Sequence, residues 1–450
     1  EKNILVLGAG SSGIGAAWVL AQLHANVVLN DYKPVEFESS TRKKLDDAGV
    51  TIITGRQDNS LLNGVDRIVI SPGIALSIPI VQEAFNRHIE VVSEVELAYD
   101  VCKSPILGVT GTNGKTTTTT LLTQVMESTG LPIKVGGNIG DSLSEAAFNM
   151  PEGGYLIAEL SSYQLETIKS FCPLGAIVLN VTPDHLARHK TMENYAAAKA
   201  RIFMNQNAEN FVVLNDDDPI VAAMKKDVHS KILSISQHHK VECGAYFEGN
   251  TCYAVLNGNV ISVIDTEQIH IKGAHNIENI LSVIALTYAL GVDVERIKRT
   301  IENFHGVEHR LERVTTIHDV TFYNDSKATN TDSVVKALDA FDKPVILLAG
   351  GHDKMTPLED FMNVVKKNTK EVIFMGEAAE RFESVATKVG VTNIHRAQSM
   401  KEAVELGYKL AEPSDIVLLS PACSSFDWYS CFEERGDDFK KCVKELEERG

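Results

Sequence analysis

The sequence predicts three consecutive α/β domains with largely parallel sheets, and three observations lead to this prediction. Apolar strand-like segments alternate with helical segments along the chain, which is typical of parallel sheets. Two glycine-rich loops, at Gly8–Gly13 and Gly111–Gly114, each follow an apolar strand and open a helix. A chain of 450 residues is too long for one hydrophobic core. We therefore expect a Rossmann-like first domain, a central P-loop ATPase-type sheet and a Rossmann-like third domain.

The first domain is predicted to span residues 1–94. An apolar strand from Asn3 runs into Gly8, Gly10 and Gly13, and a second strand ends on Asp31 about twenty residues after the loop, which is the usual dinucleotide-binding spacing. A further strand at 66–70 leads into the turn 71–73. The glycine pattern alone is a weak signal, so a nicotinamide cofactor is not concluded from it.

The second domain is predicted to span residues 95–306. Its expected strands at 155–160, 176–181 and 211–214 end in polar residues, and ligands of such sheets gather at the carboxyl ends of strands. A β-rich patch at 244–271 interrupts the alternation. The polar residues at these strand ends are Glu159, Asp184, His185 and Asn215.

The third domain is predicted to span residues 307–450. Its expected strands, at 320–323, 344–349, 371–375 and 415–419, are each followed by residues typical of turns. The segments 324–330, 350–354 and 420–425 are the turns that we expect to carry ligand-binding residues.

The loop at Gly111–Gly114 predicts a polyphosphate site, because backbone N–H groups and a helix N-terminus there can hold an anion. Lys115 would reach the β- and γ-phosphates, and the Thr116 hydroxyl would contact Mg²⁺. Val109 stands where the common pattern has glycine, a variant seen in ATP-dependent amide-bond ligases. Glu159 is the best second magnesium ligand, although a glutamate at a strand end is often merely solvated.

Composition limits the function further. The net charge of −17 argues against general binding of nucleic acid or anionic membranes. The seven cysteines form no CxxC pair or zinc-type spacing, so reduced thiols in a cytoplasm are expected. No apolar run reaches the length of a membrane span, and we expect a monomer that acts on small molecules.

Four further residues have no settled role from the sequence alone. His185 could be a metal ligand or an ordinary packed histidine. Lys199 lies on a strongly helical segment and would by default be a solvated helix lysine. Asn276 and Asn279 share a helix face, and could cap the helix or contact adenine.

Eight ordered motifs resemble the Mur ligase family along nearly the whole chain. The stretches at 159–165 and 325–330 are the discriminating ones, and they resemble the branch that joins D-glutamate to UDP-N-acetylmuramoyl-L-alanine. The motifs lie at Thr110–Thr116, Gly137–Gly140, Glu159–Leu165, His185, Asn276 with Asn279, His309–Arg310, Asp325–Asn330 and Ser420–Asp427.

The resemblance implies that ATP phosphorylates a carboxylate of the UDP-linked substrate and that the amine of D-glutamate then displaces phosphate. Lys115, His185 and Lys199 are implied as the catalytic residues. One Mg²⁺ would be held by Thr116 and Glu159, and a second by His185 and a carbamate formed on Lys199.

The resemblance also implies three sets of binding residues. The UDP-linked substrate would contact Ser11, Ser12, Gly13, Asp31, Tyr32, Ser71, Pro72, Gly73, Asn138 and Ser161. ATP would contact Gly111, Thr112, Asn113, Gly114, Lys115, Thr116 and Thr117, together with Asn276, Asn279, Arg310 and Asp325, which we group with the third domain. D-glutamate would contact Thr329, Lys354, Ser425, Phe426 and Phe432.

Alternatives remain at this point. A strand-end aspartate such as Asp31 could simply cap a turn. A folylpolyglutamate-type ligase, an NAD(P)-dependent oxidoreductase and a nucleotide-regulated binding protein are the rival functions. We expect the third domain to close on the second about a hinge at 304–307. No role is expected for Glu83, Glu94, Glu96, 216–218 and 445–448, which we interpret as solvated surface.

Overall fold

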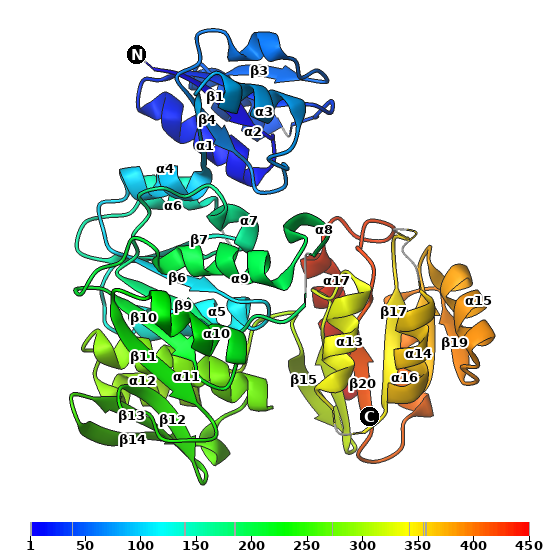
Figure 1. Cartoon of the computed structure of the whole chain (residues 1–450). Coiled ribbons are helices and arrows are strands. Elements are labelled where there is room, and N and C mark those ends of the chain that lie inside the picture. The colour runs from blue at the N-terminus through cyan, green and yellow to red at the C-terminus, as the bar shows by residue number, and fades with distance from the viewer. Residues whose placement is uncertain are drawn as a thin grey trace. The chain divides into compact units, whose positions relative to one another are not determined.

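The structure is a computed structural model that describes residues 2–37, 39–138, 141–183, 186–271, 273–341, 343–353, 355 and 358–449. Contacts divide the chain into two compact units, Glu1–Phe304 and His305–Gly450. The first unit contains two β-sheets and the second contains one, so the predicted series of three α/β domains is confirmed (Figure 1). The division between the units falls inside the expected hinge at 304–307; the hinge and the other domain boundaries stay predictions.

The first sheet is parallel throughout, with the strand order β3-β2-β1-β4-β5. Ile4 to Leu7 are buried on both faces of the central strand, because helices cover both sides of a doubly wound sheet. The strands are β1 (Asn3–Leu7), β2 (Asn26–Asp31), β3 (Thr51–Thr54), β4 (Arg67–Ile70) and β5 (Glu90–Ser93). The helices are α1 (Ser11–Gln22), α2 (Ser39–Asp47) and α3 (Pro79–Asn86).

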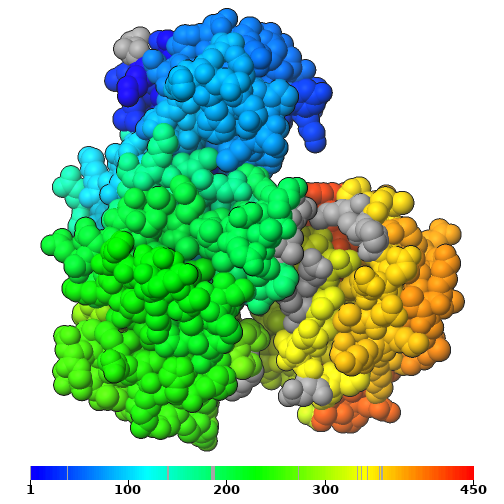
Figure 2. Space-filling model, viewed as in Figure 1, coloured from blue at the N-terminus to red at the C-terminus, as the bar shows by residue number. Residues whose placement is uncertain are grey.

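The first domain rests on the second through α1, α4 (Glu94–Val101) and α6 (Leu143–Phe148). Trp18 of α1 meets Phe148 of α6 edge to face, with ring centroids 5.7 Å apart. Leu97 of α4 belongs to the same hydrophobic cluster as the first sheet. Figure 2 shows the blue first domain in contact with the cyan and green part of the chain.

The second sheet has the order β14-β13-β12-β11-β10-β9-β6-β8-β7. It is parallel from β7 to β12, and β13 and β14 then add an antiparallel meander, which confirms the β-rich patch predicted at 244–271. Its first strands are β6 (Ile106–Thr110), β7 (Ile133–Gly137), β8 (Tyr155–Glu159), β9 (Gly175–Val178) and β10 (Phe211–Asn215). The others are β11 (Lys231–Ser236), β12 (Gly244–Glu248), β13 (Thr251–Leu256) and β14 (Asn259–Asp265).

Helices cover both faces of this sheet. Alternate strand residues, such as Leu107 and Ile106, point to opposite faces and belong to separate hydrophobic clusters. The helices are α5 (Lys115–Glu127), α7 (Ser162–Leu165), α8 (Leu186–His189), α9 (Met192–Ala200), α10 (Pro219–Ala223), α11 (Ala274–Ala289) and α12 (Val294–Glu302).

The third sheet has the order β15-β16-β20-β17-β18-β19, parallel except for the edge strand β15. Its strands are β15 (Glu312–Ile317), β16 (Val320–Asn324), β17 (Val345–Gly350), β18 (Thr369–Met375), β19 (Ile394–Ala397) and β20 (Ile416–Leu419). Its helices are α13 (Thr331–Asp339), α14 (Glu359–Asn368), α15 (Ala379–Val389), α16 (Met400–Leu410) and α17 (Phe432–Glu447).

Within the described parts of the chain, none of the helices has the length and apolar character needed to cross a membrane. All seven cysteines are free thiols.

Candidate active site

The predicted phosphate loop has the strand–loop–helix geometry expected of it. β6 ends at Thr110, and α5 begins at Lys115 directly after Gly114, whose φ of +81° lies in the left-handed region. A Cβ on Gly114 would lie 2.3 Å from Oδ1 of Asn279, so the loop and the start of α11 pack tightly together. Asn279 in turn bonds Asn276 at 3.2 Å. Both asparagines lie in the first compact unit, and our grouping of them with the third domain is wrong.

Asn180, two residues after the end of β9, also fixes the loop, and we did not predict its role. Its Oδ1 accepts from the backbone N–H of Asn113 at 2.8 Å, and its Nδ2 donates to the carbonyl of Asn113 at 3.2 Å. The backbone N–H of Thr112 donates to the carbonyl of Asn180 at 2.9 Å. The sequence signal that could have indicated this role is that Asn180 is a polar residue following an apolar strand, at the same sheet edge as the loop.

The side chain of Lys115 folds back across the loop. Its Nζ donates to the carbonyls of Gly111 and Thr112 at 2.8 and 2.9 Å. Thr116, the next residue of α5, is buried, and Thr117 is half-buried. The cation of Lys115 and the N-terminus of α5 therefore lie together at the loop, as an anion site requires.

Glu159 lies at the end of β8, in register with Val109 at the start of the loop. Its side chain is 1% exposed, so the interpretation of this residue as merely solvated is wrong. The Asn138 side-chain amide donates to Oε1 at 2.9 Å, while Oε2 has no hydrogen-bond partner among the described residues. A buried carboxylate oxygen left in this state is costly unless a cation completes it. Glu159 and the hydroxyl of Thr116 supply the hard oxygen ligands that Mg²⁺ prefers.

Lys199, on α9, also reaches the phosphate loop. The side chain is 1% exposed, its Nζ donates to the carbonyl of Gly111 at 2.8 Å, and it lies 4.7 Å from the centre of the Tyr195 ring. The default interpretation as a solvated helix lysine is therefore wrong. Lys115 and Lys199 approach the same carbonyl, which brings two predicted catalytic residues together. His185 and Asp184 lie outside the described residues.

The glycine loop of the first domain is organised by Asp31. Its carboxylate accepts from the backbone N–H of Ala9 at 2.9 Å and from that of Lys33 at 3.0 Å. Asp31 therefore caps backbone N–H groups of the loop and of the turn that follows β2, which is one of the two roles that the sequence allows. The Ser71 hydroxyl donates to the carbonyl of Gly8 at 3.2 Å, so the turn at 71–73 is hydrogen-bonded to the glycine loop. Ser11 is exposed, Ser12 is half-buried, Gly13 is buried and Tyr32 is 70% exposed.

Ser161 is the N-terminal cap of α7. Its hydroxyl accepts from the backbone N–H of Gln164 at 3.3 Å, and its own backbone N–H donates to the Gln164 side chain at 2.9 Å, forming a capping box. This cap begins two residues after Glu159. Part of the discriminating stretch at 159–165 therefore shapes the local backbone.

In the second unit, Asp325 is 4% exposed at the end of β16. Its carboxylate accepts from the hydroxyl of Ser420 at 2.7 Å and from the backbone N–H of Leu311 at 3.1 Å. Burial raises the pKa of Asp325 to about 7. His309 and Leu311, on either side of Arg310, have φ angles of +60° and +44°. Such backbone is strained in non-glycine residues and is here held around Arg310, a predicted ATP contact.

The predicted D-glutamate residues lie on loops that are bonded to one another at the carboxyl ends of β16 and β20. Ala422 N–H donates to the Ala328 carbonyl at 3.0 Å, and the Ser326 hydroxyl donates to the Phe432 carbonyl at 2.7 Å. These bonds connect the segments that carry Thr329, Ser425, Phe426 and Phe432. Ser425 is buried, Thr329 and Phe432 are half-buried and Phe426 is 68% exposed. Lys354 lies outside the described residues.

Arg435 of α17 is a second residue that the sequence did not reveal. It is 2% exposed, and it donates to the hydroxyl and the carbonyl of Ser326, both at 2.9 Å. Its Nη1 has no hydrogen-bond partner among the described residues, and burial lowers its pKa to about 10. The guanidinium therefore anchors the loop that follows Asp325.

Two acids that we expected at the surface are buried in the first unit. Glu94 is 1% exposed and accepts from the backbone and hydroxyl of Ser144, and burial raises its pKa. Glu96 is 2% exposed and accepts from three successive backbone N–H groups, those of Lys169, Ser170 and Phe171. Both carboxylates satisfy the backbone of segments distant in sequence, which local patterns do not reveal.

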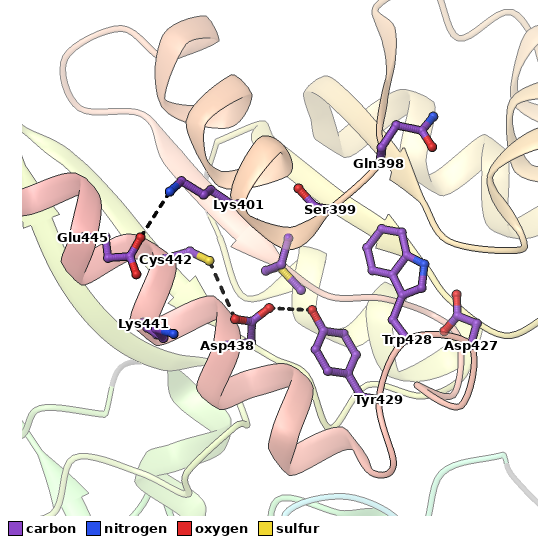
Figure 3. A pocket seen from close by; sticks show the side chains of 11 residues that line it. Gln398, Ser399, Lys401, Asp427, Trp428, Tyr429, Asp438, Lys441, Cys442 and Glu445 are labelled. Atoms are coloured by element: carbon purple, nitrogen blue, oxygen red, sulfur yellow. Dashed lines mark hydrogen bonds and ion pairs between the residues drawn. The ribbon is translucent and has the colours of Figure 1, made fainter.

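A pocket of about 600 Å³ lies elsewhere on the second unit, between α16 and α17 (Figure 3). Some of its polar groups are paired with one another: Tyr429 donates to Asp438 at 2.7 Å, and Lys401 lies 3.4 Å from Glu445. None of its lining residues is one of the predicted ligand-binding residues.

Comparison with known proteins matches this arrangement to one family. The family models for the Mur ligase MurD-like N-terminal domain, the Mur ligase middle domain and the Mur ligase glutamate ligase domain match residues 2–93, 109–287 and 309–423. The chain belongs to the Mur ligase family.

Relatives within the family carry a particular name, UDP-N-acetylmuramoylalanine–D-glutamate ligase. The relatives from Thermoanaerobacter pseudethanolicus and Caldanaerobacter subterraneus are each 42% identical to this chain. Each match covers 99% of this chain, and it covers 98% of the first relative and 99% of the second. The Clostridioides difficile relative is 39% identical, with 99% of each chain covered.

Solved structures agree on the fold. The UDP-N-acetylmuramate–alanine ligase MurC of Thermotoga maritima has a TM-score of 0.59 at 18% identity, over 99% of this chain and 100% of that one. MurF of Acinetobacter baumannii also has a TM-score of 0.59 at 16% identity, and the match covers 97% of this chain and 93% of that one.

Proposed function

We propose that this chain is an ATP-dependent ligase that joins D-glutamate to UDP-N-acetylmuramoyl-L-alanine and releases ADP and phosphate, a step in the synthesis of peptidoglycan precursors. The observation that carries the proposal is the convergence of Lys115 and Lys199 on Gly111, beside the buried Glu159. The names of full-length relatives at about 40% identity supply the substrates.

A carboxylate resists attack by an amine until one of its oxygens becomes part of a good leaving group. Transfer of the γ-phosphoryl group of ATP to that oxygen forms an acyl phosphate. The amine of D-glutamate then attacks the carbonyl carbon, and the tetrahedral intermediate expels phosphate to leave the amide. The backbone N–H groups at the start of α5 and the ammonium of Lys115 would bind and orient the phosphates and offset their charge.

Magnesium fits the residues beside the loop, because Oε2 of Glu159 is buried and has no partner among the described residues. We assign one ion to Thr116 and Glu159, and a second to His185 and a carbamate on Lys199. Carbamylation converts the lysine into an anion, which is the form that can ligate a cation. Bound magnesium supplies charge stabilisation for the transferred phosphoryl group.

The first domain would take the UDP-linked substrate instead of a nicotinamide cofactor. Ser11, Ser12 and Gly13 would bind its diphosphate through the loop and the start of α1. Asp31 already holds the loop through Ala9, so its second role would be at the uracil end, near Tyr32. The turn at 71–73 would form the wall of the pocket, with Asn138 and Ser161 nearer the reacting carboxylate.

The second unit would bind the amino acid substrate and contribute part of the ATP site. D-glutamate carries two carboxylates, which call for cations and hydroxyls. We assign them to Lys354, Thr329 and Ser425, with the backbone of Phe426 and the ring of Phe432 beside them. Arg310 and Asp325 would join Asn276 and Asn279 in binding ATP. We further propose that the enzyme is a cytoplasmic monomer.

The test is the release of ADP and phosphate from ATP, Mg²⁺ and UDP-N-acetylmuramoyl-L-alanine, with D-Glu, L-Glu, L-Lys or L-Ala as the amino acid. We expect release with D-Glu alone, and a product heavier by one glutamate. Release with a different amino acid would keep the ligase chemistry and contradict our assignment of the third domain. No release with any of them would favour the folylpolyglutamate-type or non-catalytic alternatives.

A further inference from the structure

Five side chains from α7, α8 and α9 form a continuous stack within the first unit. The guanidinium of Arg188 lies 4.3 Å from the centre of the Tyr163 ring. The ring of His189 lies between Tyr163 and Tyr195, at centroid distances of 5.5 and 5.2 Å, with its planes tilted by 32° and 37°. Lys199 completes the stack, 4.7 Å from the centre of the Tyr195 ring. Such cation–ring contacts are favourable, and more so when they are desolvated.

One end of the stack reaches the phosphate loop. The hydroxyls of Tyr195 and Thr112 lie 3.1 Å apart, and Nζ of Lys199 donates to the carbonyl of Gly111. His189 is also fixed from the side, because its Nε2 lies 2.9 Å from the hydroxyl of Ser162. The orientation of the stack is thus tied to the residues proposed to act on ATP.

The other end reaches the first domain through the planar fork of Arg188. Two of its nitrogens donate to the carboxylate of Glu166, at 3.2 and 2.6 Å. Its Nη1 donates to the carbonyl of Pro72 at 2.7 Å, and Nη2 donates to that of Ile74 at 3.0 Å. The Arg188 side chain is only 19% exposed, so these bonds are largely shielded from water.

The segment that Arg188 holds is a turn against the glycine loop. The backbone N–H of Ile74 closes the turn on the carbonyl of Ser71 at 3.1 Å, and the Ser71 hydroxyl donates to the carbonyl of Gly8. Contacts of defined geometry therefore run from Gly8 through the turn and Arg188 to the phosphate loop.

We propose that Arg188 is a positioning residue that fixes the turn Ser71–Ile74, and with it the UDP-linked substrate, relative to the phosphate loop and Lys199. The inference rests on the proposed function in that it takes the first domain to bind this substrate. Arg188 contacts carbonyls of the turn and acts on the substrate through them. Without it, the substrate's reacting carboxylate would arrive in a less defined position.

Lysine cannot replace arginine here. The guanidinium presents its donors in one plane, which serves a carboxylate and two carbonyls at once while stacking on Tyr163. An ammonium keeps the charge but cannot meet all four acceptors in that geometry.

The experiment compares R188K and R188M with wild type and with R201K. Arg201 is a matched control: it also donates to two carbonyls, those of Leu165 and Ile168, but both belong to the second domain. In R188K we expect KM for UDP-N-acetylmuramoyl-L-alanine to rise roughly tenfold, while KM for ATP stays within about threefold. R201K should leave the ratio of these two constants unchanged.

A second measurement does not depend on turnover. Backbone hydrogen exchange over residues 71–78 should become faster in R188M and stay unchanged in R201K, because Arg188 donates to the carbonyls of Pro72 and Ile74 and Arg201 does not. Unchanged exchange and an unchanged KM ratio in both Arg188 variants would overturn the inference. A uniform loss of all constants with a lower Tm would overturn it too, since that is a purely structural effect. If wild-type protein makes no product, the proposed function fails, and the exchange comparison still decides the role of Arg188.

Discussion

Asn138 holds Glu159 by one oxygen and leaves the other without a partner: its side-chain amide donates to Oε1 at 2.9 Å, while Oε2 is buried and unbonded among the described residues. We predict that Glu159→Gln lowers kcat by about 100-fold or more, because the proposed magnesium ligand becomes neutral. Stability should not fall, since the substitution removes an uncompensated buried charge. Activity titrated against Mg²⁺, with the Tm measured in parallel, checks this.

The matched control for this variant is Glu152→Gln, which changes an exposed carboxylate in the same domain. It should retain wild-type activity and the wild-type dependence on Mg²⁺. A Glu159→Gln enzyme that keeps wild-type kcat at low Mg²⁺ would remove Glu159 from the metal site.

The proposed carbamylation of Lys199 would make activity depend on dissolved carbon dioxide. We predict that depleting bicarbonate lowers the activity of wild-type protein and that adding it back restores activity. Lys199→Arg should lose about 100-fold or more in kcat, because a guanidinium keeps the positive charge and forms no carbamate. The check is steady-state activity against bicarbonate for both proteins. Full activity in Lys199→Arg would show that the positive charge itself suffices.

Gly114 should tolerate no side chain. An alanine at this position would have to adopt the left-handed φ of +81°, and its Cβ would lie 2.3 Å from Oδ1 of Asn279. Gly153 is the matched control, because its φ is +84° and an added Cβ has no atom within 4 Å. We predict that Gly114→Ala raises KM for ATP about tenfold or more, whereas Gly153→Ala loses only stability, by about 1 kcal/mol. Equal KM values in the two variants would contradict the tight packing of α11 on the loop.

Asp325 should make stability fall as the pH rises. Its pKa is about 7 in the folded chain, against 3.8 for an unperturbed aspartic acid side chain, so between these values the folded state binds more protons than the unfolded chain. The neutral form is favoured by burial, and its contribution is full below about pH 4 and is lost as the pH rises through 7. Asp325→Asn removes this titration. The difference in unfolding free energy between the two proteins, measured by denaturant at about pH 4.5 to 7.5, should move in favour of the variant as the pH rises. A constant difference would contradict a raised pKa.

Local patterns predicted the elements that ligands use, and they missed features that depend on distant contacts. The strands β6, β8 and β17 are largely apolar, because both faces of a parallel strand are covered. β15 is an edge strand of mixed polarity that we did not predict, although the β-branched residues in Val314–Ile317 favour a strand.

The site shows the same division. Lys115 and Thr116 follow from a motif whose geometry is local. The burial of Lys199 and Glu96 depends on segments that fold against them, and from the sequence alone we interpreted both as solvated. Arg188 stands in no predicted set, because its role rests on two carbonyls more than a hundred residues earlier in the chain.

The central claim is that the γ-phosphoryl group passes to a substrate carboxylate, and oxygen-18 in the terminal carboxylate of UDP-N-acetylmuramoyl-L-alanine tests it most directly. If an acyl phosphate forms, the oxygen that bridges carbon and phosphorus leaves with the phosphate. Mass spectrometry of the phosphate released in the presence of D-glutamate should therefore find one labelled oxygen per molecule of amide formed. Unlabelled phosphate, with the amide still formed, would contradict the account.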